Sequence, residues 1–400
     1  MALRLISVLA LSTVLGCGSV AIAQTAPAAD LSVFTAHNDS AERHIDYSVL
    51  SDLLHDIVLE VPRMDRIPER APPNMTGTRI TTANMTRYRY EANRVIYHAM
   101  SDEYKAAITA YRQELEALPS QIDFGSLSSD EQLAYWLNLH NVAVIEQIMQ
   151  EYPTTYINRL NAVGTREPLF EARFLNVAGI PLSLNDIRLR IVYEQWDDPR
   201  VIYGFFNGAI GGPEIRRDAF TGQRVWRQLE TNAGEFVNAL RGVETHREDL
   251  RVSHIYAEAG RFFPDFDNDL RAHLRRYATG DTVEQLEDGR EVRTDVETWN
   301  IADMANGSLR CTGAGGPTPM QISSTYRFRD QAYTAASSPS CADLPSNGLI
   351  VMNAVQVRRI ELLRSGRYGE VYTVDIPTED PGPSSTLIQR GDTAPDSENE

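Results

Sequence analysis

The stretch from Ser128 to about Tyr152 constrains the fold of this chain more than any other. Ser128 or Ser129 starts a helix, and Glu131 or Gln132 lies three residues on, as in a capping box. Apolar residues then fall on every side of the helical projection: Leu133, Trp136, Leu137, Val144 and Ile148 share one face, and Tyr135, Leu139, Val142 and Ile145 occupy the others. A helix that is apolar nearly all round is buried on all sides. We therefore expect a central buried helix around which the domain packs.

The segments around this helix predict a mixture of helices and short strands. Helical periodicity covers 45–61, 85–118, 184–193, 221–240 and a pair over 251–277 that is broken at Pro264. Residues 174–181 are typical of a short hairpin, and 201–206 of a buried strand that ends in the glycine-rich turn 207–213. The predicted fold class is α+β, with the central helix packed on a small sheet.

The two ends of the chain and the region after Gly280 differ in composition. Residues 24–40 and 381–400 are small, polar or acidic and predict disordered tails. Strand-like segments at 292–301, 325–328, 349–357 and 371–376 alternate with Gly/Ser/Pro loops, so we interpret 281–380 as a mainly β appendage to a domain over 41–280.

Residues 1–23 have the pattern of a secretory signal peptide. Arg4 precedes an apolar run that ends in Ala21-Ile22-Ala23, the small-x-small pattern of cleavage before Gln24. The expected location is periplasmic or secreted, with no integral membrane span after processing. Cys17 lies in a lipobox-like sequence, which leaves a lipoprotein anchored at that residue as the alternative.

Cleavage at this site would leave Cys311 and Cys341 as the only cysteines. An even pair in an exported protein predicts a disulfide, here in Gly/Pro/Ser-rich surroundings. The competing roles, a reactive thiol or a metal pair, have no histidine or acidic cluster nearby.

Charge excludes one class of partner. The formal net charge is −17, and the cationic side chains, nearly all arginines, are dispersed along the chain. An acidic surface without a basic patch disfavours nucleic acid and anionic lipid. The remaining partners are an envelope small molecule or a protein.

Four segments, in order, carry a resemblance to a known family. They are 134–141 (AYWLNLHN), 183–187 (SLNDI), 198–213 (DPR through GGP) and 252–256 (VSHIY). Together they resemble the domain of unknown function 547 family over about residues 120–280. The resemblance suggests a papain-like or transglutaminase-like α+β fold.

The residues that the family pattern would make reactive are replaced in this chain. Ile202 stands where the family has histidine, Asn207 and Gly212 stand at its two cysteines, and Arg188-Leu189 replaces a frequent Glu-His. If the family uses a thiolate, which needs a neighbouring base or cation, this member has lost that chemistry. If the family's cysteines form a disulfide or pack in the core, their replacement leaves function unaffected.

Polar residues near the same loop are the candidates for ligand binding. Asp198, Arg200 and Arg216 offer charges, Asn207 and Gly212 lie in the permissive turn, and His140 lies on the central helix. Each has a structural alternative: a salt bridge that fixes the turn for Asp198 and Arg200, and a hydrogen-bonded core histidine for His140.

The function that these residues predict is non-catalytic binding of a ligand or partner in the cell envelope. No nucleotide-binding, nucleophile-elbow or zinc-protease motif occurs, so no cofactor, metal or catalytic residue is assigned. The alternative is an envelope hydrolase or transferase that uses non-thiol residues, with His254 as a further candidate base. A histidine within hydrogen-bonding reach of residues 207–213 would favour that alternative.

Overall fold

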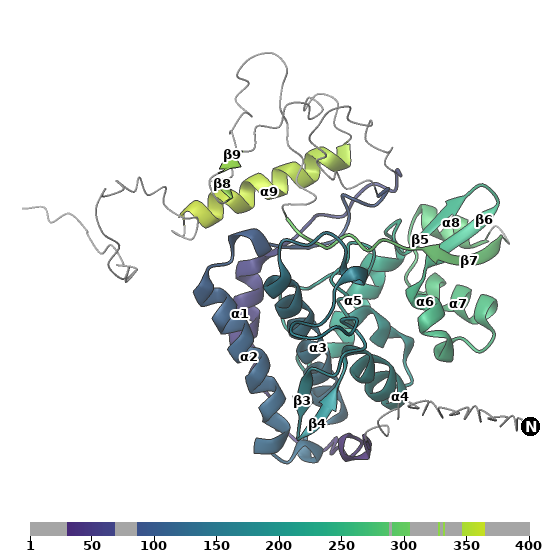
Figure 1. Ribbon diagram of the computed structural model, residues 1–400. Coiled ribbons are helices and arrows are strands. Elements are labelled where there is room, and N and C mark those ends of the chain that lie inside the picture. Colours follow the sequence, from purple (N-terminus) through teal and green to yellow (C-terminus); the bar gives the residue numbers. More distant parts are fainter. Residues whose placement is uncertain are drawn as a thin grey trace, which may run out of the picture. The chain divides into compact units, whose positions relative to one another are not determined.

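The computed structural model describes residues 30–68, 86–287, 290–304, 327–328, 331–332 and 346–364. The chain comprises two compact units, Met1–Val355 and Gln356–Glu400. In the first unit, α2 (Asp102–Gln121) and α5 (Val225–Val237) both pack against α3 (Ser129–Glu151), as Figure 1 shows. Small sheets lie around these helices, which confirms the predicted α+β class.

Helix α3 is the predicted central helix. Every residue from Glu131 to Met149 is buried, because apolar side chains on all faces leave no side for water. The Ser128 hydroxyl caps the helix by accepting the Glu131 N–H at 3.2 Å. The Glu131 carboxylate does not complete the capping box, since it accepts the Ile45 N–H at 3.1 Å instead. This bond ties the N-terminal segment to the central helix.

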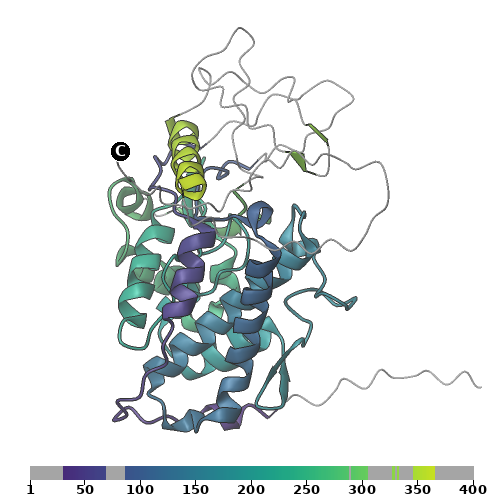
Figure 2. The same cartoon turned by 90° about the vertical axis from the view of Figure 1, so that its left-hand side faces the viewer.

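The N-terminal segment contributes to the core earlier than predicted. The 3-10 helix η1 (Ser32–Phe34) places the Phe34 ring edge-on against Trp136, with ring centroids 5.0 Å apart. Residues 30–40 therefore differ from the predicted tail, because one aromatic side chain is enough to fix a short polar segment to a core. Helix α1 (Ser48–Ile57) follows, and Figure 2 shows it running beside α2.

Residues 86–101 are turns and a short strand rather than the predicted start of a helix at 85. Strand β1 (Val58–Leu59) pairs with β2 (Arg94–Val95), and η2 (Tyr97–Ala99) follows. Helix α2 starts only at Asp102, because the Ser101 hydroxyl accepts the Tyr104 N–H and caps it there. The 3-10 helix η3 (Phe124–Ser126) then leads into α3, and η4 (Ile157–Arg159) follows it.

The region 174–206 combines confirmed elements with one wrong prediction. Strands β3 (Leu175–Val177) and β4 (Ile180–Leu182) form the predicted hairpin, and the predicted helix is a π-helix, η5 (Asp186–Val192), continued by α4 (Tyr193–Gln195). The predicted strand at 201–206 is a 3-10 helix, η6 (Pro199–Gly204). Pro199 presets a helical φ and the Asp198 carboxylate caps the first turn, which outweighs the β propensity of the aromatic residues.

The predicted boundary at Gly280 is not a boundary in the fold. Strands β5 (Val243–His246), β6 (Asp249–Ser253) and β7 (Glu291–Val296) form one sheet, in which β6 pairs antiparallel with β5 and parallel with β7. Helices α6 (Ile255–Glu258), η7 (Gly260–Phe262) and α7 (Phe266–Arg275) lie between β6 and α8 (Asp281–Glu287) in sequence. Residues 281–287 and 290–304 therefore belong to the same body as the predicted domain (Figure 1).

The later described segments are β8 (Arg327–Phe328), β9 (Gln331–Ala332) and α9 (Ser346–Arg364). A helix at α9 corrects the predicted strand at 349–357: Val351 and Val355 are both buried at helical spacing, so packing outweighs the β-branched composition. None of the helices in the described part of the chain is long and apolar enough to cross a bilayer. Cys17, Cys311, Cys341, the predicted signal peptide, the strand at 371–376 and the tail at 381–400 lie outside the described residues.

Candidate functional site

The loop that the sequence selects, residues 198–217, is anchored at its start by an internal ion pair. The Arg200 guanidinium donates to both Asp198 carboxylate oxygens, with Nη2 to Oδ2 at 2.7 Å. It also pairs with Glu230 at 3.2 Å and lies 4.8 Å from the centre of the Trp226 ring. Although partial burial opposes it, these hydrogen bonds hold the pKa of Asp198 below its usual value. Asp198 and Arg200 thus bind each other.

Two amides on α3 hold the backbone that follows. Asn141 donates from Nδ2 to the Gly204 carbonyl at 2.9 Å and accepts the Phe206 N–H at 3.0 Å. Asn138 binds the backbone of Phe220 in the same way: it donates to the Phe220 carbonyl at 2.8 Å and accepts the Phe220 N–H at 2.9 Å. Each amide pairs both a donor and an acceptor of buried backbone, which an apolar residue would leave unpaired. The Asn-x-x-Asn spacing therefore has a structural role.

The segment around Asp186 is likewise structural. Asp186 accepts the Ser183 N–H at 3.1 Å while the Ser183 hydroxyl accepts the Asp186 N–H at 2.9 Å, a reciprocal cap at the start of η5. Arg173 and Arg190 both pair with the same carboxylate. Arg188, at the first position of the replaced Glu-His, donates to Glu258 at 2.6 Å. These charges fix helices and are not free for a substrate.

The replaced positions at 202, 207 and 212 have a clear geometric relationship. The Ile202 side chain is buried, with 2% of the residue exposed. Asn207 and Gly212 face each other across the turn: a Cβ added at Gly212 would lie 2.1 Å from Asn207 Oδ1 and 2.4 Å from its Cγ. The Asn207 Oδ1 atom accepts the Ala209 N–H at 3.0 Å. Asn207 therefore fills the space beside Gly212 and closes the turn.

Both candidate histidines pack against aromatic rings. His140 is 1% exposed, its ring packs edge-on against Phe205, and its Nδ1 lies 3.2 Å from Asn141 Oδ1. Burial lowers the pKa of His140 to about 3, so the ring is neutral at pH 7. The His254 ring lies against Trp299, with centroids 4.8 Å apart. Neither ring makes a hydrogen bond to residues 207–213.

Arg216, the last sequence candidate, is also engaged within the protein. Its Nη1 donates to Asn232 Oδ1 at 2.7 Å and to the Gln228 carbonyl at 3.4 Å. A cavity of about 10 Å³ lies between Arg216, Phe220, Asn138 and helix α1, and a second of about 10 Å³ lies under α1. Each has room for about one water molecule. These cavities are too small for a metabolite.

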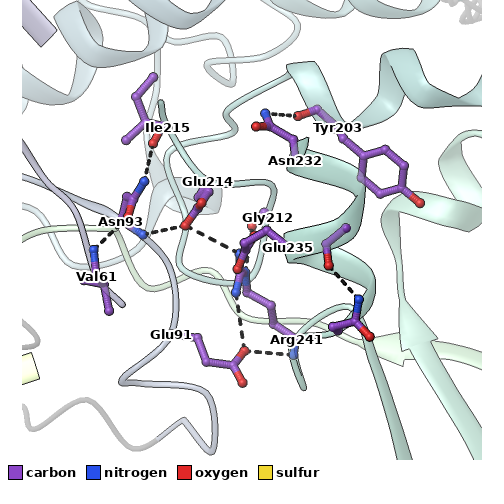
Figure 3. A network of polar contacts seen from close by, with 12 residues as sticks. Val61, Glu91, Asn93, Tyr203, Gly212, Glu214, Ile215, Asn232, Glu235 and Arg241 are labelled. Carbon is purple, nitrogen blue, oxygen red and sulfur yellow. Dashed lines mark hydrogen bonds and ion pairs between the residues drawn. The ribbon is translucent and has the colours of Figure 1, made fainter. Parts of the chain in front are cut away.

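The structure reveals a buried charge cluster that the sequence did not suggest. We call it the Arg241 cluster: Arg241 with the carboxylates of Glu91, Glu214 and Glu235 (Figure 3). The Arg241 side chain is 1% exposed, and its Nε donates to the Gly212 carbonyl at 3.2 Å. Its nitrogens lie 2.5 Å from Glu235, 3.6 Å from Glu91 and 4.0 Å from Glu214. The cluster therefore joins the 207–213 turn to α5.

Backbone donors distribute unequally among the three carboxylates. Glu91 accepts two backbone N–H groups, from Leu240 at 2.9 Å and Arg241 at 3.0 Å. Glu214 accepts one, from Asn93 at 3.1 Å. Burial and the nearby Glu235 carboxylate raise the pKa of Glu214 to about 8, against the pull of Arg241. Burial likewise raises the pKa of Glu91. One guanidinium thus faces three carboxylates, of which Glu91 is buried and Glu214 and Glu235 are 17% and 28% exposed.

Asn93 completes the connection on the other side of the turn (Figure 3). Its Nδ2 donates to the Ile215 carbonyl at 2.9 Å, and its Oδ1 accepts the Val61 N–H at 2.8 Å. No sequence pattern pointed to these residues, because Glu91, Glu214 and Arg241 come from three segments with no fixed spacing. Glu214 does lie in the loop that the sequence selected, directly after Gly212-Pro213.

Comparison with known families supports the resemblance. The family described as "Protein of unknown function, DUF547" matches residues 124–237. This range contains the first three of the four resembling segments and ends before the segment at 252–256. No curated protein and no solved structure matches this chain in comparison.

Proposed function

We propose that this chain, whose residues 124–237 match the domain of unknown function 547 family, is an exported, non-catalytic protein that binds a protein partner in the cell envelope. The observation that carries the proposal is the state of the 198–217 loop. Its three charged candidates, Asp198, Arg200 and Arg216, already bind groups of the protein itself. The motif residues that this chain retains are those that hold the loop in place.

Residue types and burial at the loop support the proposal of a non-catalytic protein. Ile202, Asn207 and Gly212 carry no nucleophile or base, and His140 is neutral and enclosed. General acid–base chemistry needs a titrating group within hydrogen-bonding reach of the reacting atoms. The alternative of an envelope hydrolase or transferase would need a base at the turn, and neither candidate histidine supplies one.

A protein partner fits the surface better than a small molecule does. The cavity beside Arg216 and the one under α1 each hold about one water molecule, so a ligand there would have to displace the protein's own contacts. Gln223 and Arg224, which follow the loop in sequence, are by contrast exposed. With a net charge of −17, the chain as a whole attracts a partner with a basic surface. Export rests on the signal-peptide pattern of residues 1–23.

Site-specific photo-crosslinking in the native envelope tests this proposal. A crosslinking amino acid placed at Gln223 is expected to give one discrete, larger species. The same amino acid at Glu114, which is exposed on α2, serves as the matched control. Identical patterns from both positions would contradict a partner at the loop.

A thermal-shift screen of the protein that begins at Gln24 tests the small-molecule alternative. Peptidoglycan fragments, sugars, amino acids and short peptides are expected to leave the unfolding midpoint unchanged. A dose-dependent rise with any of them, together with no specific crosslink, would replace the protein partner by a ligand of that class.

A further inference from the structure

A second buried polar cluster lies where η2 and the C-terminal end of α3 meet residues 300–304. The Asp303 side chain is 1% exposed, and its Oδ2 accepts the Tyr152 hydroxyl at 3.0 Å. His98 Nδ1 lies 4.0 Å from Asp303 Oδ1. An isolated β-bridge between Val95 and Asp303 fixes this carboxylate beside the segment that contains His98. We call Asp303, Tyr152, His98, Tyr97 and Arg94 the Asp303 cluster.

Two members of the cluster carry buried polar atoms that no described group pairs. The Tyr97 ring stacks on Tyr152 with centroids 5.8 Å apart, and its hydroxyl has no hydrogen-bond partner in the described part of the chain. Arg94 is 0% exposed, and its Nη2 donates to the Arg89 carbonyl, but its Nε and Nη1 have no partner among the described residues. Unpaired buried polar atoms are costly, and in native structures they point to a bound water or ion.

The distances within the cluster are those between ligands of one metal ion. Ligands with bonds of about 2.0–2.1 Å lie about 2.9 Å apart at right angles and about 4.2 Å apart on opposite sides of an ion. The 3.0 Å and 4.0 Å distances from Asp303 to Tyr152 and His98 fall within this range. The described residues contain no group of three or more histidine, cysteine, aspartate or glutamate side chains placed for a metal ion. A metal at Asp303 therefore needs a phenol oxygen among its ligands.

The phenol decides which ion fits. Burial and the Asp303 carboxylate raise the pKa of Tyr152, so its hydroxyl keeps its proton unless a strongly polarising cation replaces it. The ferric ion is trivalent and hard, so it binds phenolate and carboxylate oxygens, and it also accepts imidazole. Burial lowers the pKa of Arg94, and Asp303 is the charge that most opposes this shift, so the guanidinium lies within the field of the site. Arg94 repels a bare cation, but its unpaired nitrogens suit an oxygen anion that shares the ion.

We propose that the Asp303 cluster is a ferric-ion site, in which Tyr152, Asp303 and His98 bind the metal and Arg94 holds a small oxygen anion beside it. As the iron–oxygen bond forms, the Tyr152 phenol gives its proton to solvent, and the iron stays ferric throughout. The hydrogen bond between Tyr152 and Asp303 is replaced by a bond from each residue to the ion. The site is separate from the surface at Gln223 and does not depend on a protein partner.

Titration of the intact protein with ferric nitrilotriacetate in bicarbonate buffer tests the site. Phenolate bound to ferric iron gives a charge-transfer absorption band in the visible range, which the free protein lacks. The wild type is expected to show a band that saturates at stoichiometric iron. Bicarbonate is expected to raise the iron affinity at least tenfold, because it supplies the anion for Arg94. A wild type without the band would overturn the site, and an affinity independent of bicarbonate would overturn the role of Arg94.

Variants assign the band to particular side chains. Tyr152→Phe keeps the ring that stacks on Tyr97 and is expected to abolish the band, with circular dichroism as the check on folding. Tyr104→Phe is the matched control, because the Tyr104 hydroxyl also donates to a carboxylate, that of Asp56, and its removal should leave the band unchanged. His98→Gln keeps the phenol and should weaken iron binding at least tenfold, which makes the test independent of folding defects at position 152. A band that persists in Tyr152→Phe, or wild-type affinity in His98→Gln, would refute the assigned ligands.

Discussion

Asn141→Ala should destabilise the protein strongly, because the side chain is buried and pairs with the backbone. Asn141 is 7% exposed and pairs with two buried backbone groups, the Gly204 carbonyl at 2.9 Å and the Phe206 N–H at 3.0 Å. Leaving a buried polar group unpaired costs about 1–3 kcal/mol. Two such groups give an expected loss of about 2–6 kcal/mol in the free energy of unfolding.

Equilibrium urea denaturation, followed by tryptophan fluorescence, measures this loss. Asn176→Ala is the matched control, because Asn176 is exposed on β3 and its change should stay within about 0.5 kcal/mol. Asn141→Asp separates the two bonds: it keeps the acceptor for Phe206 but sets a carboxylate against the Gly204 carbonyl. If Asn141→Ala lost less than about 1 kcal/mol, the structural role assigned to the Asn-x-x-Asn spacing would be refuted.

Four further predictions concern the turn and two titrating groups. Gly212→Ala should destabilise by about 1–2 kcal/mol in urea denaturation, because its Cβ would displace Asn207 from its bond to Ala209. The double variant Asn207→Cys/Gly212→Cys should instead form a disulfide, which mass spectrometry detects as two cysteines, beyond those of the wild type, that resist alkylation until the protein is reduced. Burial lowers the pKa of His140 from 6.5 to about 3, so the folded state binds fewer protons than the unfolded state between these pH values. The free energy of unfolding should therefore fall by up to about 1.4 kcal/mol per pH unit as the pH drops below 6.5. His140→Phe should flatten this slope, and an unchanged slope in the variant would contradict the prediction. For Glu214 the pH dependence of stability has the opposite sign, because its pKa is raised from 4.5 to about 8. The free energy of unfolding should fall by up to about 1.4 kcal/mol per pH unit as the pH rises between these values. Glu214→Gln should remove this dependence in the same denaturation series.

Local sequence signals predicted correctly the elements whose ends are marked by capping or turn residues. Helix α3 begins where Ser128 can cap it, and the β3–β4 hairpin forms where the pattern placed it. The strand predicted at 201–206 was wrong because the cap and the proline at its start outweighed its β propensity. Helix α9 was missed because the burial of Val351 and Val355 on one helix face outweighed the β propensity of these valines. In both cases context decided between two locally acceptable structures.

The candidate site followed the same division. The sequence identified the loop at 198–217 and the loss of reactive residues at Ile202, Asn207 and Gly212. It left open whether Asp198 and Arg200 bind a ligand or each other, and the structure shows that the two side chains pair, with Arg200 Nη2 2.7 Å from Asp198 Oδ2.

The sequence by itself determined the central buried helix, the α+β class and the family resemblance, because helical periodicity, capping residues and motif order are properties of neighbouring residues. The tertiary structure alone decided that Asn207 and Gly212 face each other, that 281–304 joins the main body, and that Glu91, Glu214 and Glu235 share Arg241. The charge cluster assembles residues separated by more than a hundred positions, and its energetics depend on burial. Local sequence spacing does not predict which distant side chains approach each other or how far they are buried. The raised pKa of Glu214 therefore could not be predicted before the fold was known.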